Sequence, residues 1–288
     1  MSATLERLRT LRRQAGQGAR AASAVTPPLL PPPQAPASAR TTPAQTIDDL
    51  RRLLRVRAPE RATLPRGPVE RTLPGVEIAP GLRLIEHRMP WDALPDAFGV
   101  AFARREGERR FCDVLCFDTE TTGLAGGTGT RAFMIGAARW DDDGFLVRQW
   151  LMTALQAERE LLAAFARDLR DDTVLVSYNG RSYDAPLLAA RFRLARLHNP
   201  LPACEHLDLL HPARRRWRGC WENCRLATIE RRVLGIVRED DLPGSEAPAA
   251  WLQYLRGGPS RNLCRVAEHN RQDLVSLAGL LVHLADGP

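Results

Sequence analysis

Residues 115–124 read LCFDTETTGL and place two carboxylates, Asp118 and Glu120, inside an otherwise apolar segment. The pattern of residues 113–120 predicts a β-strand, and side chains two residues apart on a strand point to the same face. Asp118 and Glu120 are therefore expected side by side. Two carboxylates held together away from water repel each other, so a positive partner is expected near them. Salt bridges to arginine at a sheet edge are one such arrangement.

The segments after this strand follow a regular pattern. Residues 132–140 and 145–152 each predict a further strand, and the turn sequence DDDG separates them. A helical pattern in residues 157–170, a β-branched strand in 173–178 and a second helix in 184–197 follow. Three consecutive strands predict an antiparallel meander, and the strand-helix-strand passage adds a parallel strand beside it. The order β-β-β-α-β-α is that of a ribonuclease H-like sheet.

Composition divides the chain into three expected parts. Residues 1–57 contain ten arginines and three acids, an excess that equals the net charge of +7 of the whole chain, and much of this arm is rich in Pro, Ala, Ser and Thr. We expect it to be largely disordered with short helices, and either to hold a polyanion or to remain a solvated tail. Residues 58–110 predict a small strand-and-turn subdomain, and residues 111–286 predict the main domain. Outside the basic arm, the net charge of the chain is close to zero.

The sequence shows no feature of a membrane or exported protein. It has no run of about 18 apolar residues and no signal peptide, so we expect a cytoplasmic location and no membrane partner. Its six cysteines then predict no disulfide framework. The pair Cys220 and Cys224 has no second pair at zinc-site spacing, which favours ordinary thiols.

Two further acidic sites accompany the first. Asp184 follows a predicted strand and begins a predicted helix, where it is also suited to capping that helix. His269 and Asp273 lie four residues apart on the last predicted helix, a spacing that also suits a surface pair. Together with Asp118 and Glu120, these positions give four carboxylates on a strand and two helices. Such a set suits two hard cations with oxygen ligands, and Mg²⁺ or Mn²⁺ fits it better than zinc or copper.

Three motifs carry a family resemblance. The stretches FDTETTGL, NGRSYDAPLL and HNRQDLVSL resemble the three motifs of the DEDD exonuclease superfamily, which has a ribonuclease H-like fold. The blocks HLDLLHPARRRWRGCWENCRLATIERRVLG and REDDLPGSEAPAAWLQYLRGG resemble the YprB-type ribonuclease H-like domain. The resemblance covers roughly residues 111–285. It implies an α/β fold with a mixed five-stranded sheet flanked by helices.

The resemblance also implies roles for single residues. Asp118, Glu120, Asp184 and Asp273 match the metal ligands, and His269 matches the catalytic position of the third motif. The positions expected to bind substrate are Thr121, Asn179, Tyr183 and Asn270. The third motif of the family is Tyr-x3-Asp or His-x4-Asp, whereas this chain has His269-x3-Asp273, a histidine at the tyrosine spacing.

The resulting hypothesis is a metal-dependent 3′–5′ exonuclease that hydrolyses phosphodiester bonds of DNA or RNA with two Mg²⁺ or Mn²⁺ ions. One alternative is a nucleic-acid-binding module of the same fold with weak or no nuclease activity. Another is a structure-selective endonuclease. The sequence leaves DNA and RNA, single and double strands, and protein partners open.

Overall fold

The computed structural model describes residues 69–123, 129–238 and 241–287. The chain divides into two units, Met1–Ala62 and Thr63–Pro288, and all described residues belong to the second. The predicted basic arm, residues 1–57, lies outside the described residues.

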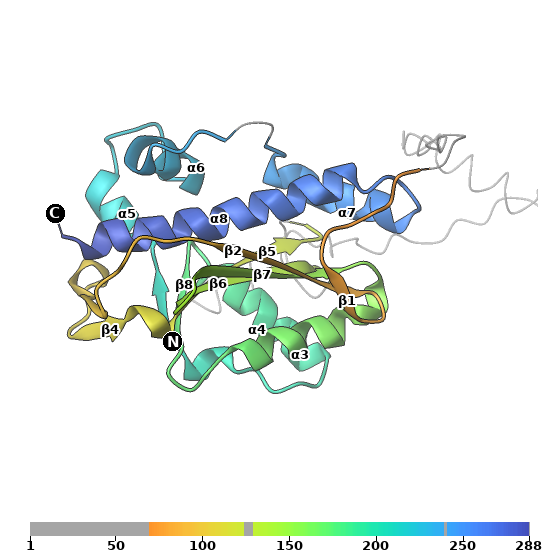
Figure 1. The fold of residues 1–288 in the computed structure, drawn as a ribbon, viewed down its shortest axis with the longest axis horizontal. Helices are drawn as coiled ribbons and strands as arrows, with labels where there is room; N and C mark the ends of the chain where they lie inside the picture. Colours follow the sequence, from red (N-terminus) through yellow and green to blue (C-terminus); the bar gives the residue numbers. More distant parts are fainter. Residues whose placement is uncertain (1–68, 124–128, 239–240, 288) are drawn as a thin grey trace, which may run out of the picture. The chain divides into compact units, whose positions relative to one another are not determined.

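Seven strands of the described part form one mixed sheet in the order β1-β2-β7-β6-β5-β8-β9 (Figure 1). These strands are β1 (Val76–Ala79), β2 (Leu82–Met89), β5 (Val114–Thr121), β6 (Ala132–Asp141), β7 (Gly144–Met152), β8 (Val174–Ser177) and β9 (Glu205–Asp208). β5, β6 and β7 are antiparallel neighbours, and β8 runs parallel to β5 and β9. The predicted meander and the predicted parallel strand are both confirmed.

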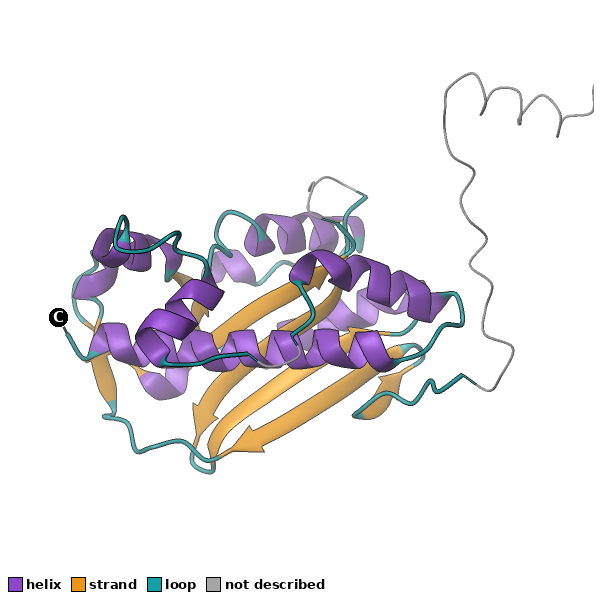
Figure 2. Cartoon of the chain, turned by 90° about the horizontal axis from the view of Figure 1, so that it is seen from above, coloured by secondary structure: helices purple, strands orange, loops and turns teal. Residues whose placement is uncertain are grey.

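Helices cover both faces of this sheet. They are α3 (Glu158–Asp168), α4 (Asp184–Leu194), α5 (Leu210–Trp217), α6 (Leu226–Ile229), α7 (Ala247–Leu255) and α8 (Arg261–Ala285). α3 and α4 lie on one face, and α8 crosses the other with α5, α6 and α7 on its side (Figures 1 and 2). The predicted α/β ribonuclease H-like architecture is confirmed.

The sheet is wider than predicted. The five strands β7, β6, β5, β8 and β9 make the expected unit, and β1 and β2 extend it to seven because β2 pairs with β7 along its full length. Residues 76–89, which we expected in a separate subdomain, therefore belong to the main sheet. Within 97–110 only the short strands β3 (Ala97–Gly99) and β4 (Glu108–Arg110) form a sheet of their own. The prediction failed here because short apolar runs between turns do not reveal which edge they pair with.

Strand β5 lies in the middle of the sheet and contributes side chains to both layers. Leu115 and Phe117 belong to the core cluster that includes α3 and α4 residues, whereas Val114 and Cys116 belong to the cluster that includes the second half of α8. All four are at most 1% exposed. The same alternation continues to the end of the strand, so Asp118 and Glu120 lie on the α8 face.

Helix α8 is anchored by an apolar stripe. Its residues, which recur at helical spacing in the sequence, are all buried: Leu263, Val266, Leu274, Leu277, Leu280 and Leu281. Between Val266 and Leu274 the helix approaches β6 at Gly136, which pairs with Asp118. A Cβ atom at Gly136 would lie 2.1 Å from Asn270 Oδ1 and 2.8 Å from Leu274 Cδ1. The glycine therefore allows α8 to lie close enough to β5 for their polar side chains to meet.

We predict that Gly136→Ala lowers the free energy of unfolding by about 1–3 kcal/mol, because the added methyl group overlaps atoms of α8. Urea denaturation of the full chain measures this change. Gly99→Ala is the matched control, since Gly99 lies on β3 with no other residue's atoms within 4 Å of the added carbon. Equal stability of the two variants would contradict the close packing of α8 on β6.

Candidate metal and nucleic-acid site

The end of β5 presents the first two carboxylates of the site. Glu120 is buried and Asp118 is half-buried. Asn270 Nδ2, from α8, donates a 2.9 Å hydrogen bond to Asp118 Oδ2. The predicted common face of Asp118 and Glu120 is consistent with this contact, since α8 packs on that face alone.

The side chain of Asn270 is held in place by a residue of β7. This side chain is fully buried, and its Oδ1 atom accepts a 2.8 Å hydrogen bond from Gln149 Nε2. Gln149 also donates to the backbone oxygen of Ala267, at 2.7 Å. Asn270 was expected to bind substrate. That role stays a prediction; in the structure Asn270 fixes the orientation of Asp118, and Gln149 is a supporting residue that sequence reasoning missed.

Asp184 reaches the site from α4, which lies on the face of the sheet opposite α8. It is the first residue of α4 and is buried, and Thr119 Oγ1 donates a hydrogen bond to its Oδ1 atom. Since Thr119 lies between Asp118 and Glu120 on the other face of β5, this bond ties the second motif to the first. The alternative of an N-cap aspartate is wrong, because Tyr183 is the N-cap of α4 and Asp184 is its first residue, although a carboxylate there is still favourable near the helix N-terminus.

The loop before Asp184 is shaped by β9. Asp208 accepts hydrogen bonds from the backbone nitrogens of Asn179, at 2.8 Å, and Arg181, at 3.1 Å. Asn179 adopts a left-handed backbone conformation with φ of 69°, which asparagine tolerates better than most residues. Asp208 is thus a further positioning residue. The sequence contained it in the LDLL stretch but gave no sign of its partners.

Tyr183 and Thr121 join the loops that follow β5 and β8. The Tyr183 hydroxyl donates to the backbone oxygen of Gly123, at 2.8 Å, and lies 3.1 Å from Thr121 Oγ1. Both residues were expected to bind substrate. In the structure their hydroxyl groups connect the two loops that lie beside the carboxylates. Residues 124–128, which follow the first loop, lie outside the described residues.

Helix α8 supplies the third motif. His269 and Asp273 lie on one face, with His269 Nε2 3.6 Å from Asp273 Oδ2. On the other side of the ring, Nδ1 is 2.6 Å from Asp241 Oδ1. Arg238 Nη1, which can only donate, also lies 3.0 Å from Nδ1. Nδ1 therefore either accepts from Arg238 or donates to Asp241, and only the second tautomer leaves Nε2 as the acceptor nitrogen that faces the site. A surface pocket of about 290 Å³, lined by His269, Asp241 and Arg238 among others, opens beside it.

Arg238 is the cation of this site. Its guanidinium forms ion pairs with Asp273 and with Glu230, which is 1% exposed. Burial alone would lower the pKa of Arg238, but its hydrogen bonds to Glu230 and Asp273 raise it above the ordinary value. Sequence reasoning missed this residue, because nothing local indicates that it reaches Asp273, 35 positions further along the chain.

The four carboxylates of the site have too few positively charged partners to neutralise them. Within the described part of the chain, Asp118, Glu120 and Asp184 form no ion pair, so the salt bridges that the sequence left open are absent there. Burial raises the pKa of Asp118 and of Glu120 well above their ordinary values, and the nearby Asp273 and Asp184 charges raise them further. Burial also raises the pKa of Asp273, although His269 and Arg238 oppose the shift. The pKa of Asp184 rises to about 6 for the same reason.

The donor set fits hard divalent cations by its chemistry. Carboxylate oxygens are the ligands that Mg²⁺ and Mn²⁺ prefer, and a cation would supply the missing positive charge. However, no three His, Cys, Asp or Glu side chains in the described ranges are arranged to hold a metal ion as they stand. Asp118, Asp184 and Asp273 are instead bonded to Asn270, Thr119 and Arg238 respectively. Hydrogen bonds from neutral donors such as Asn270 and Thr119 are compatible with ligation, whereas Asp273 binds an ion only when it parts from Arg238.

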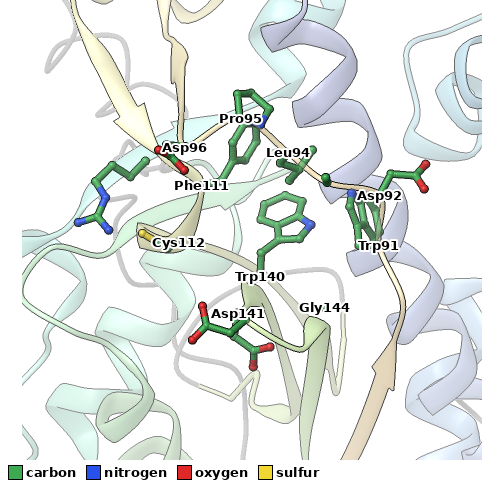
Figure 3. Close-up of a pocket in the computed structure, with 13 residues that line it drawn as sticks. Trp91, Asp92, Leu94, Pro95, Asp96, Phe111, Cys112, Trp140, Asp141 and Gly144 are labelled. Atoms are coloured by element: carbon green, nitrogen blue, oxygen red, sulfur yellow. The ribbon is translucent and has the colours of Figure 1, made fainter.

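A separate pocket of about 560 Å³ lies beside the start of β5 (Figure 3). Trp91, Trp140 and Phe111 line it together with several acidic residues. Cys112, another lining residue, lies in the 3-10 helix that precedes β5, and Asp118 lies a further roughly 13 Å along the strand from Val114, where β5 begins. This pocket is therefore distinct from the carboxylate site.

Comparison with known proteins agrees with this fold. The family profile described as RNase_H superfamily matches residues 115–285. The chain is 39% identical over 174 residues to "Uncharacterized protein YprB" of Bacillus subtilis (strain 168), an alignment that covers 60% of this chain and 42% of that relative. This chain therefore spans less than half the length of the curated relative it matches.

One solved structure matches part of this chain. It is the family B DNA polymerase of Pyrobaculum calidifontis, matched with a TM-score of 0.47 and 17% identity over 60% of this chain and 25% of that one. Separately, none of the helices in the described residues is long and apolar enough to cross a membrane. On the strength of the family match, which spans more than half of its residues, the chain belongs to the RNase H superfamily.

Proposed function

We propose that this protein is a metal-dependent 3′–5′ exonuclease that hydrolyses phosphodiester bonds of DNA or RNA. The observation that carries the proposal is the convergence of Asp118, Glu120, Asp184 and Asp273 around the end of β5 with raised pKa values and one guanidinium between them. Clustered acids with perturbed pKa values are typical of functional sites. The 3′–5′ polarity rests on the resemblance to DEDD exonucleases.

The four carboxylates would hold two Mg²⁺ or Mn²⁺ ions, which when bound supply the Lewis-acid stabilisation that phosphodiester hydrolysis requires. The protein's own groups then orient these ligands. Asn270 sets the direction of Asp118, and Thr119 that of Asp184. Partners of this kind contribute about 10–100-fold to metal affinity or activity in other proteins.

His269 is the proposed proton acceptor. Its hydrogen bond to Asp241 fixes the ring so that Nε2 faces Asp273 and the site. A neutral imidazole in this orientation accepts a proton at Nε2 while Asp241 stabilises the resulting charge. The histidine thereby takes the role expected of the third motif, at a spacing of four residues.

One observation favours the alternative of a binding module with weak or no nuclease activity. Arg238 forms an ion pair with Asp273, a bond that competes with a metal ion for the same carboxylate. Thermal unfolding with and without Mn²⁺ separates the two functions. An ion that binds the folded protein raises the melting temperature by an amount that grows with the logarithm of its concentration above the Kd, and no rise at millimolar Mn²⁺ would favour the binding module.

We predict that Asp118→Asn reduces Mn²⁺-dependent degradation of a 5′-labelled oligonucleotide by more than about a hundredfold, since it removes a metal ligand rather than a partner of one. Product ladders on denaturing gels measure the rate and the polarity. Asp142→Asn, at an exposed position in the β6–β7 turn, is the matched control. Undiminished degradation by folded Asp118→Asn protein would refute the assignment of the site.

We predict that His269→Ala loses about 10²–10⁴-fold in rate, the usual contribution of a general base, while Mn²⁺ still raises its melting temperature. The comparison of single-turnover rates with thermal shifts separates proton transfer from metal binding. A variant with full turnover would assign the proton acceptor to another group. A variant that no longer responds to Mn²⁺ would instead make His269 part of the metal site.

We predict that Asp184→Asn is more stable than the wild type at pH 7 in EDTA, by on the order of 1–3 kcal/mol. The folded protein binds the Asp184 proton with a pKa of about 6, against 3.8 in the unfolded chain, so its stability falls as the pH rises between these values. Asparagine lacks that loss, and the difference should disappear near pH 4. Urea denaturation from pH 4 to 8 measures it, with Asp142→Asn as control. Equal pH dependence of the unfolding free energy in the wild type and Asp184→Asn would contradict a buried Asp184 carboxylate with a raised pKa.

A further inference from the structure

The segment from α5 to the end of the α6 region concentrates positive charge on an otherwise near-neutral unit. Seven arginines lie between residues 214 and 232, and all seven are exposed. The same stretch has two acids. Glu222 is paired with Arg231, and Glu230 is buried and paired with Arg238. A strongly positive surface remains.

Two tryptophans lie among these arginines. The rings of Trp217 and Trp221 are stacked, with centroids 5.9 Å apart and an interplanar angle of 24°. The guanidinium of Arg216 lies 5.4 Å over Trp217, and the His283 ring is 5.9 Å from it. Both tryptophans are half-buried, so part of each ring packs on the core and part faces outward.

Several of the arginines are available to an external anion. Arg218, Arg225 and Arg232 are exposed and form no ion pair in the part of the chain that the structure describes. By contrast, Arg215 donates to the Phe102 backbone and Arg216 to that of Gly287. The side chains of the first three therefore remain open to an external anion, although Arg232 is near enough to Glu222 to help lower the pKa of that carboxyl.

This surface lies close to the carboxylate site. α5 begins two residues after Asp208, which shapes the second-motif loop, and the Tyr178 hydroxyl donates a 2.6 Å hydrogen bond to the backbone oxygen of Cys224. Along α8, His283 follows Asp273 by ten residues, a distance of about 15 Å. At the rise of about 3.4 Å per nucleotide of a duplex-like, stacked strand this corresponds to roughly four nucleotides, and an extended single strand spans it with fewer.

We propose that residues 214–232 form a binding surface for single-stranded nucleic acid, in which Arg218, Arg225 and Arg232 contact phosphates and bases stack on the tryptophan pair. Exposed arginines beside aromatic rings are the features with which proteins bind unpaired strands. Stacking requires bases that are not already stacked in a duplex, so a single strand is the preferred occupant. The inference rests on the proposed function, because it supplies the surface that holds the strand whose end enters the site.

The test uses the full chain in EDTA, so that binding is measured without hydrolysis. Fluorescence anisotropy gives affinities for dT12, dT4 and U12, over a range of salt concentrations. For the triple variant Arg218→Gln, Arg225→Gln and Arg232→Gln we expect at least tenfold weaker binding of dT12. We also expect a salt dependence that is shallower by about two, since each phosphate contact on a single strand contributes about 0.7 to the slope.

The matched control removes three exposed arginines elsewhere, by Arg193→Gln, Arg256→Gln and Arg261→Gln. It should bind dT12 like the wild type. Equal losses in the two triple variants, or none in either, would overturn the proposal. The wild type should bind dT12 at least tenfold more tightly than dT4, and U12 shows whether RNA is bound as well. Tighter binding of a 12-base-pair duplex than of dT12 would also overturn it.

The tryptophans are tested with Trp221→Leu, which keeps an apolar side chain on the core and removes the aromatic face. Stacking of one base typically changes affinity by about tenfold or more, so we expect a loss of that size for dT12. An abasic 12-mer carries the same phosphates without bases, and its affinity should not change. Equal affinity of the wild type for dT12 and the abasic strand would overturn the role of the tryptophans.

The proposed nuclease activity and the proposed binding surface can each be disproved without the other. Binding of dT12 that depends on Arg218, Arg225 and Arg232, in a protein that never cleaves it with Mn²⁺, would disprove the nuclease and keep the surface. Cleavage and binding at wild-type levels in the triple variant would disprove the surface and keep the nuclease.

Discussion

The carboxylates of Asp118 and Glu120 lie next to each other on the α8 face of β5, and their mutual repulsion is the constraint that the surrounding structure has to meet. Asp184 and Asp273 add two more negative groups at the same place. Such a cluster opposes folding at neutral pH, because each buried carboxylate is costly to ionise. The fully buried residues earlier on β5 place the cluster at the end of a strand that is packed on both faces, where the fold is hardest to distort.

The structure orients these acids more than it neutralises them. Asn270 and Thr119 are neutral donors, so their hydrogen bonds to Asp118 and Asp184 fix geometry and leave the charge in place. Among the four acids, in the part of the chain that the structure describes, only Asp273 has a full positive partner, Arg238, which is shared with Glu230. An excess of negative charge on side chains that are already held in position favours a divalent cation. The same reasoning makes Arg238 the group whose displacement would accompany binding.

Local patterns were enough to predict much of this arrangement. Apolar runs bounded by turn residues gave the strands of the meander, and the three motifs located Asp118, Glu120, Asp184 and Asp273. The supporting residues could not be found this way, because their contacts span long separations. Arg238 reaches Asp273 over 35 positions, and Gln149 reaches Asn270 over 121. The pairing of β2 with β7 was missed for the same reason, since β2 is placed in the sheet by a partner some 60 residues away.

A net charge near zero outside the arm conceals two regions of opposite sign. The carboxylate cluster repels phosphates, whereas the arginines between residues 214 and 232 attract them. In the absence of cations, a strand bound to this unit would therefore be held by the arginine surface and kept away from the acids. Cations at the carboxylates would reverse the local sign and allow the end of the strand to approach. Metal binding and strand placement are coupled in this arrangement, because the strand is attracted at both places only after the acids are neutralised.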